Sequence, residues 1–236
     1  MRALILALGV CLASTPVRAQ SVASLFTNLP ADVAHLFTPT NGIIAGVGGA
    51  GAAAIHPKDD EIASHIYRAS GARHDFFHAG ATIGDGVEQG SFALGMYVVG
   101  RVSKRDGVAS SGADLIDAQI VNGLLTQGIK VSTNRKRPSG GPHSFPSGHT
   151  SATFATAEVL REHYGWKVGA AVYAIGGYVS ISRMVDNQHW ASDVVFGSAI
   201  GIVSARAASF RHGSAAVSIS PSLLSRGLAI VGSIRR

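Results

Sequence analysis

The apolar stretches of this chain are rich in small residues, and this limits how the chain can fold. Its 236 residues include 29 glycines, and only 14% are charged. Such a chain either packs helices closely through small side chains or enters a membrane. The longest unbroken apolar run after the first 20 residues, Gly42 to Ile55, has 14 residues. That length suits a buried helix better than a membrane span.

Apolar periodicity, broken by Gly-rich and Pro-rich segments, predicts a series of helices. We expect them over residues 30–37, 42–55, 58–69, 84–100, 112–129, 150–164, 167–182 and 190–208. Asp59 and Asp60 suit the start of the third, since acidic side chains favour a helix N-terminus. Glu158 and Arg161 give the sixth the pattern of an amphipathic soluble helix. We therefore predict an all-α fold, a compact soluble bundle with its site between helices, and leave contact with a membrane surface open.

The first 19 residues have the pattern of an export signal. A positive start at Arg2 precedes an apolar stretch over residues 3–13, and residues 17–19 form a small-x-small cleavage site. Cys11, the single cysteine, lies inside this segment, so the mature protein would contain no disulfide. We therefore predict a signal peptide over residues 1–19, export to the periplasm, and a helical domain over residues 20–213.

The end of the chain has a different pattern. Val217 and Ile219 alternate with serines, residues 225–227 suit a turn, and apolar residues alternate again after it. A period of two residues is typical of β-strands. We therefore expect a small β-hairpin in a C-terminal tail over residues 214–236, with Pro221 marking an edge or irregular position.

Three short blocks in the second half of the chain carry residues suited to phosphoryl chemistry. They are KVSTNRKRP over residues 130–138, PSGH over 146–149 and SRMVDNQHWASD over 182–193. A bound phosphoryl group needs fixed positive charge, hydrogen bonds to its oxygens, a nucleophile and an acid. The blocks supply cations, neutral donors and proton-handling groups: Lys130, Arg137 and Arg183; Ser147 and Gly148; His149, His189 and Asp193.

Local structure explains why two of these blocks suit an anion and a nucleophile. Ser147 and Gly148 stand where a loop gives way to a predicted helix, and the unpaired N–H groups of a helix N-terminus attract anions. Taken alone, such a serine would be a simple N-cap. His189 and Asp193 are four residues apart, so they share a face if the helix begins near His189. A carboxylate at one ring nitrogen leaves the other nitrogen free to attack phosphorus.

In order and spacing, the three blocks resemble the signature of the type 2 phosphatidic acid phosphatase family, K-x6-RP, PSGH and SR-x5-H-x3-D. This family includes bacterial non-specific acid phosphatases and lipid phosphatases, and it shares its site with vanadium-dependent haloperoxidases. The resemblance covers about 64 of the 236 residues. Every defined position matches: Lys130, Arg137, Pro138, Pro146, Ser147, Gly148, His149, Ser182, Arg183, His189 and Asp193.

The resemblance implies a metal-independent phosphatase that needs no cofactor. His189 would be the nucleophile that forms a phosphohistidine, and Asp193 would orient it. His149 would protonate the leaving oxygen and later activate water. The three cations would neutralise the equatorial oxygens of the phosphoryl group, and Ser147 and Gly148 would add hydrogen bonds. The substrate would be a small-molecule phosphomonoester, a lipid phosphate or a pyrophosphate, and the sequence does not decide between them.

Two other functions stay open. Vanadate copies the phosphoryl transition state, so a vanadium-dependent haloperoxidase could use the same ligands. An envelope protein could also bind phosphate without turnover. A nucleic-acid binder is not expected, because its basic residues would interleave with aromatic residues over a larger surface. His74 and His78 have the spacing of metal ligands. No third candidate ligand follows at a sequence spacing typical of metal sites, so we predict no metal site.

A few further residues fit more than one role. Arg135 and Lys136 belong to the basic cluster of the first block, and a solvated face explains them as well as a phosphate contact does. Gly197 and Gly201 form a small-xxx-small pair that would let two helices of the bundle approach closely. Asp85 could face the substrate pocket, although its position does not require it.

Overall fold

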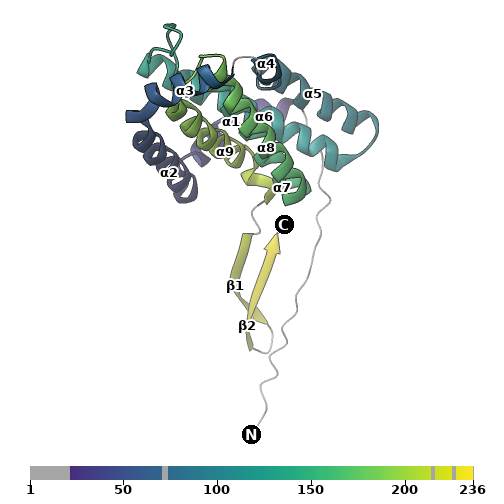
Figure 1. Ribbon diagram of the computed structural model, residues 1–236. Helices are drawn as coiled ribbons and strands as arrows, with labels where there is room; N and C mark the ends of the chain where they lie inside the picture. The colour runs from purple at the N-terminus through teal and green to yellow at the C-terminus, as the bar shows by residue number, and fades with distance from the viewer. Residues whose placement is uncertain (1–21, 71–73, 214–215, 225–226, 236) are drawn as a thin grey trace. The chain divides into compact units, whose positions relative to one another are not determined.

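The computed structural model describes residues 22–70, 74–213, 216–224 and 227–235, and α-helices make up most of this part (Figure 1). The predicted all-α fold is therefore confirmed. The predicted signal peptide, residues 1–19, lies outside the described residues. The helices are α1 (Val22–His35), α2 (Pro39–Ile55), the 3-10 turn η1 (His56–Lys58), α3 (Asp59–Ser70), α4 (His74–Ile83), α5 (Gly86–Val102), α6 (Asp106–Thr133), α7 (Gly148–Tyr164), α8 (Trp166–Val185) and α9 (Ala191–Gly213).

Tertiary packing explains where the helices depart from the prediction. The sequence analysis missed α4, a ten-residue helix, which is held against α8 by ring contacts of Phe76 and Phe77 with Tyr178. It also began α6 six residues too late, at residue 112 rather than Asp106. Ser110 and Ser111 in that first part are fully buried. Small polar residues with weak helix propensity are helical here because they pack against neighbouring helices.

Small side chains fill the core where the helices meet. Alanines from four helices surround Leu115 and Val159 in one buried cluster: Ala93 of α5, Ala118 of α6, Ala155 of α7, and Ala205 and Ala208 of α9. Short side chains allow helix axes to approach closely, and the interior is then filled without large residues. This agrees with the close packing that the composition predicts.

The predicted role of Gly197 and Gly201 is confirmed at the contact of α9 with α7. A Cβ atom at Gly201 would lie 2.2 Å from the carbonyl oxygen of Ser151, and one at Gly197 would lie 2.8 Å from that of Ser147. Both distances are shorter than van der Waals contact, so only glycine allows this approach. The contact holds the start of α7, which carries the PSGH block, against the start of α9.

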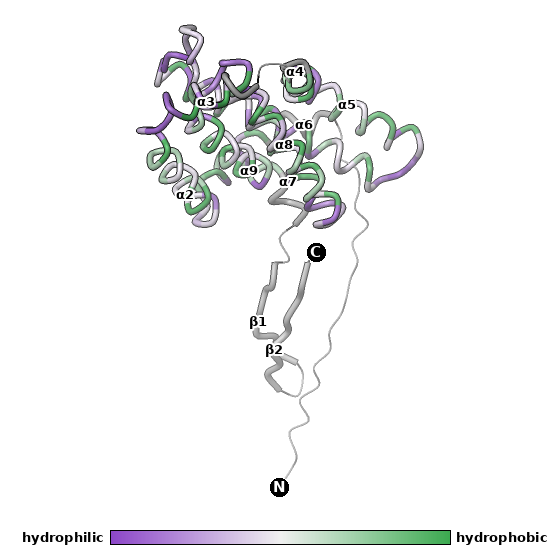
Figure 2. Tube along the Cα trace, in the orientation of Figure 1, coloured by the Kyte–Doolittle hydropathy of each residue, from purple (hydrophilic) through white to green (hydrophobic). Residues whose placement is uncertain are grey.

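Part of the helical surface is apolar. Figure 2 shows long hydrophobic stretches in α5 and α8, and Val102 and Trp166 are 79% and 67% exposed. Two segments, Trp166–Val185 and Ala191–Ala208, are long and apolar enough to cross a membrane, and 33% of the first and 72% of the second is buried. α8 has 20 residues rather than the 16 predicted, so its length does not by itself exclude a membrane span. The soluble form of the bundle stays a prediction.

The predicted C-terminal hairpin is present as two strands, β1 (Ala216–Leu224) and β2 (Gly227–Arg235). They pair antiparallel, with Ala216 opposite Arg235 and Leu224 opposite Gly227. The domain boundaries after residues 19 and 213 stay predictions.

Candidate active site

The two cations of the first block that the motif assigns to phosphate lie at the end of α6 and in the loop between α6 and α7. Lys130, in the last turn of α6, donates from Nζ to the carbonyl of His143 at 2.7 Å. Arg137 donates to the carbonyl of Pro142 at 3.0 Å and to Oε1 of Gln188 at 2.5 Å. Burial lowers the pKa of Lys130 to about 8, and nearby Arg137 adds to this effect, which Asp193 opposes. The two cations therefore lie close enough to repel each other.

The PSGH block forms the N-terminus of α7 beside Lys130. Ser147 is the N-cap, and its buried Oγ accepts from the backbone N–H of Thr150 at 3.4 Å. Its own N–H donates to the carbonyl of Asp193 at 3.1 Å. A Cβ atom at Gly148 would lie 3.8 Å from Cε of Lys130. The helix terminus and the lysine thus present positive charge at the same place.

His149, the second residue of α7, faces a group of cations. Burial lowers its pKa to about 4, with further lowering from Arg183, His189 and Lys130, whereas Asp85 acts in the opposite sense. Nε2 of His149 lies 3.8 Å from Oδ2 of Asp85, the N-cap of α5. The imidazole is therefore neutral at neutral pH in the free site, and a bound anion would favour its protonation.

Arg183 and Ser182 bring the third block into the same region from the end of α8. Arg183 is 6% exposed and forms an ion pair with Asp186. Within the described part of the chain, Nε of Arg183 and Oγ of Ser182 are buried without a hydrogen-bond partner. Leaving a buried donor unpaired costs about 1–3 kcal/mol. An anion that accepts from the guanidinium would remove this cost.

His189 lies in the loop between α8 and α9 and is 3% exposed. Its backbone N–H donates to the carbonyl of Arg183 at 3.2 Å, which ties the loop to the end of α8. Burial lowers the pKa of its imidazole below the usual value, and Asp193 offsets this effect only in part. The ring is thus held neutral, which is the form with a free lone pair for attack on phosphorus.

Asp193 is fully buried in the first turn of α9. The helix begins at Ala191 rather than near His189, so the expectation of one shared helix face was wrong. The two side chains still meet, with Nδ1 of His189 3.4 Å from Oδ2 of Asp193. The same oxygen accepts from the backbone N–H of Trp190 at 2.9 Å and from the hydroxyl of Ser144. The bond to Trp190 resembles half of a capping box and fixes the carboxylate to the helix end.

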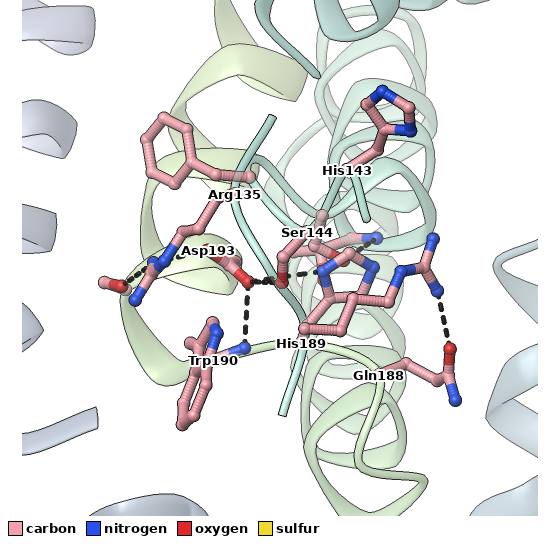
Figure 3. A network of polar contacts seen from close by, with 12 residues as sticks. Arg135, His143, Ser144, Gln188, His189, Trp190 and Asp193 are labelled. Carbon is pink, nitrogen blue, oxygen red and sulfur yellow. Dashed lines mark hydrogen bonds and ion pairs between the residues drawn. The ribbon is translucent and has the colours of Figure 1, made fainter. Parts of the chain in front are cut away.

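Several residues around this site were missed or weighed too low in the sequence analysis. Arg135, for which a solvated face was an equal explanation, is only 21% exposed and bonds to Asp193 and Asp59. Figure 3 shows Asp193 with Arg135 on one side and Ser144 and His189 on the other. Arg135 and Ser144 lie in or beside the sequence blocks, so their positions were a usable signal. Asp59 lies 76 residues before Arg135. Its sequence context indicated only the start of a helix.

The histidine pair considered as a metal site receives no support from its surroundings. Among the described residues, no group of three or more His, Cys, Asp or Glu side chains is placed to hold a metal ion. Nδ1 of His78 lies 3.8 Å from Oδ1 of Asp186, and the side chain of His74 lies outside the described part.

Two histidines, a buried carboxylate and three cations gather near the N-terminus of α7, and these are the kinds of group that binding and transfer of a phosphoryl group require. Residues 112–212, which contain all three blocks, match the sequence model of the PAP2 superfamily. This match agrees with the resemblance seen in the motifs.

Two known proteins are similar to this chain, one in sequence and one in fold. Over 95 residues the chain is 39% identical to a lipid A 1-phosphatase of Porphyromonas gingivalis, a match that covers 39% of this chain. The chain spans about a fifth (21%) of the length of that relative. The crystal structure of Aquifex aeolicus LpxE has a TM-score of 0.54 and 22% identity, over 64% of this chain and 93% of that one. At this identity the similarity shows the fold alone.

Proposed function

We propose that the chain is a phosphatase that works without a metal ion, through a phosphohistidine on His189, on a lipid phosphate ester or pyrophosphate. The observation that carries the proposal is the buried Nε of Arg183, which has no acceptor among the described residues. Around it, burial in the first place and neighbouring cations in the second lower the pKa values of Lys130 and His149. Groups perturbed in this way favour a functional site.

In the first step, Nε2 of His189 forms a bond to phosphorus while the bond from phosphorus to the ester oxygen breaks. The ring gains positive charge, which the carboxylate of Asp193 at Nδ1 stabilises. The leaving oxygen takes a proton from His149, which has taken up that proton from solvent because the negative charge of the bound phosphoryl group favours the imidazolium. Guanidinium groups have five N–H donors, so Arg137 and Arg183 can bind the phosphoryl oxygens beyond their present contacts.

In the second step, water attacks the phosphohistidine. His149, now neutral, takes a proton from the water as its oxygen bonds to phosphorus, and the bond from phosphorus to His189 breaks. Inorganic phosphate leaves, His149 returns its proton to solvent, and both histidines are again in their starting state. The sum is hydrolysis of one phosphate ester, with no redox change and no other reactant.

Two observations favour a lipid substrate over a soluble one. The relative from Porphyromonas gingivalis is a lipid A 1-phosphatase and matches at 39% identity over 95 residues. Exposed apolar side chains on α5 and α8 would also suit a lipid surface, for example Val99, Val102 and Trp166. We therefore infer association with a membrane, and we expect lipid phosphates to be better substrates than sugar phosphates or nucleotides.

The test is phosphate release from a substrate panel in the presence of a chelator. The panel contains a chromogenic phosphate ester, phosphatidate, phosphatidylglycerol phosphate, a polyprenyl pyrophosphate and lipid A, each with and without detergent. We expect chelator-resistant release that vanadate inhibits and that is highest on a lipid. Inactivity on every substrate of the panel would refute the proposal that the chain is a phosphatase. Halide oxidation by peroxide after vanadate loading would instead identify a haloperoxidase.

A further inference from the structure

We propose that Arg135 and Asp59 position the Asp193–His189 pair and so set the direction and charge of the carboxylate that supports the nucleophile. This inference rests on the proposed function, because it assigns a catalytic consequence to residues that do not touch the phosphoryl group. Both act through Asp193, so they are positioning residues.

The contacts of Arg135 join two carboxylates from different parts of the fold. Its Nη1 donates to Oδ1 of Asp193 at 2.6 Å, and its Nη2 donates to Oδ2 of Asp59 at 2.7 Å. The guanidinium carbon lies 5.5 Å from the centre of the Trp190 ring. A planar guanidinium can satisfy two acceptors in fixed directions, which an ammonium group cannot do as well.

Asp59 is anchored to α9 in its own right. Its Oδ1 accepts from the backbone N–H of Ser192 at 3.0 Å, and its Oδ2 accepts from the hydroxyl of Ser192 at 2.5 Å. Burial alone would raise the pKa of Asp59, but hydrogen bonds from Ser192 and Arg135 outweigh it and hold the pKa below its usual value. Asp59 is therefore ionised at neutral pH, and the start of α3 is tied to the residue next to Asp193.

This arrangement has two consequences for the catalytic pair. Arg135 occupies Oδ1 of Asp193, so Oδ2 is the oxygen that faces His189 (Figure 3). Asp59 shares the charge of Arg135, so the guanidinium does not cancel the whole charge of Asp193. The carboxylate keeps negative charge for the imidazolium that forms when His189 attacks. Orienting partners of this kind typically change activity 10- to 100-fold when removed.

The matched variants are Arg135→Ala and Lys136→Ala, since Lys136 is the adjacent, exposed basic residue. We expect Arg135→Ala to lower kcat by about 10- to 100-fold, with KM and the inhibition constant for vanadate changed less than about threefold. Lys136→Ala should leave all three unchanged. A loss in KM or vanadate binding that exceeds the loss in kcat would mean that Arg135 binds the phosphoryl group itself, and would overturn the proposal.

A double-mutant cycle separates positioning from general destabilisation. If Arg135 acts through Asp193, then Arg135→Ala added to Asp193→Asn should lower kcat by less than about threefold more. If the two losses multiply, the proposal is wrong. Should Arg135→Ala fold poorly, Arg135→Ala with Asp59→Asn removes the unpaired carboxylate, and Arg135→Lys keeps the charge. Both should fold, and both should still lose kcat.

A measurement without substrate keeps this test independent of the phosphatase assay. The pKa of His189 is followed by ring NMR, with assignment from a His189→Gln variant. We expect Arg135→Ala to raise this pKa, because Asp193 then has no competing cation, and to leave it unchanged in the Asp193→Asn background. No rise in the first variant would overturn the positioning role even in an active enzyme. A rise in a protein that hydrolyses no substrate would refute only the proposed function.

Discussion

Two buried ionic clusters lie along α7, and they differ in how their charges are matched. The first, here called the Glu158 cluster, comprises Glu158, Arg161, Tyr173 and Arg206. Glu158 accepts two bonds from Arg161 at 2.7 Å, one from Arg206 at 3.3 Å and one from the hydroxyl of Tyr173. Burial would raise the pKa of Glu158, but these bonds outweigh it and lower the pKa, and the pKa of Arg161 is raised in turn. Each partner strengthens the charge of the other.

The second cluster, at the N-terminus of α7, behaves in the opposite way. The pKa values of Lys130 and His149 are lowered by burial and by neighbouring cations. A buried N–H of Arg183 lacks an acceptor in the described part of the chain. Nε of Arg206 in the Glu158 cluster is also buried without a partner among the described residues, so the two clusters differ in charge rather than in unpaired donors. The Glu158 cluster matches a carboxylate to its guanidinium groups, whereas the second cluster holds like charges together, as the proposed function requires of a site for an external anion.

The largest effect on turnover is expected when the nucleophile is removed from the second cluster. We expect His189→Ala to lower kcat at least about a thousandfold, because the remaining groups cannot form the covalent intermediate. Vanadate should still bind, since the cations are intact. Phosphate release and vanadate affinity measured on one preparation check both points. Equal losses in turnover and vanadate binding would contradict the separation of roles.

Removing the acid and base should have a smaller effect on the first step than on the second. We expect His149→Ala to lower kcat by about 10²- to 10³-fold. A substrate with a good leaving group needs little protonation, so phosphoenzyme should still form and then accumulate. Quenched-flow measurement of bound label against time checks this. A variant that releases phosphate at the normal rate would exclude His149 from the second step.

Glu158→Ala should affect stability and spare the chemistry. Removing one partner of a buried ion pair costs up to about 3–5 kcal/mol, and among the described residues Arg161 and Arg206 would keep only Glu162 as a nearby carboxylate. We expect this loss in the free energy of unfolding, with kcat per folded molecule unchanged. Denaturant unfolding of wild type and variant, with kcat measured well below the transition, provides the check. A large fall in kcat would mean that the two clusters are coupled along α7.

The smallest effect is expected from pH. Lys130 is charged below its pKa of about 8 and neutral above it, so kcat/KM should fall as the pH rises through 8, by roughly tenfold for one lost phosphate contact. Lys130→Arg should remove this fall in kcat/KM, which is the break in the pH profile, since arginine stays charged. A pH profile of both proteins between pH 6 and 10 tests the assignment, and an identical break in the variant would contradict it.

The parts of the site that the sequence predicted are those fixed by local spacing. Ser147 as N-cap, Gly148 beside Lys130, and the contact of His189 with Asp193 follow from residues within a few positions of each other or from the motif pattern. The close approach of two helices at Gly197 and Gly201 could also be predicted from the sequence, because small residues one helical turn apart typically mark a close helix contact.

The parts that the sequence did not predict depend on contacts through space. Asp59 joins Arg135 across 76 residues, and no local pattern distinguishes it from an ordinary helix start. For Arg135, the sequence left a solvated face and a phosphate contact as equal explanations, because charge alone says nothing of burial. The length of α8 and the presence of α4 depend on packing that overrides weak propensity.

The central claim is that His189 carries the phosphoryl group, and rapid-quench trapping with labelled substrate tests it most directly. Wild type and His149→Ala should yield protein-bound label that is acid-labile and base-stable, and His189→Ala should yield none. Label retained on His189→Ala in that same form would mean that another residue is the nucleophile and would contradict the account.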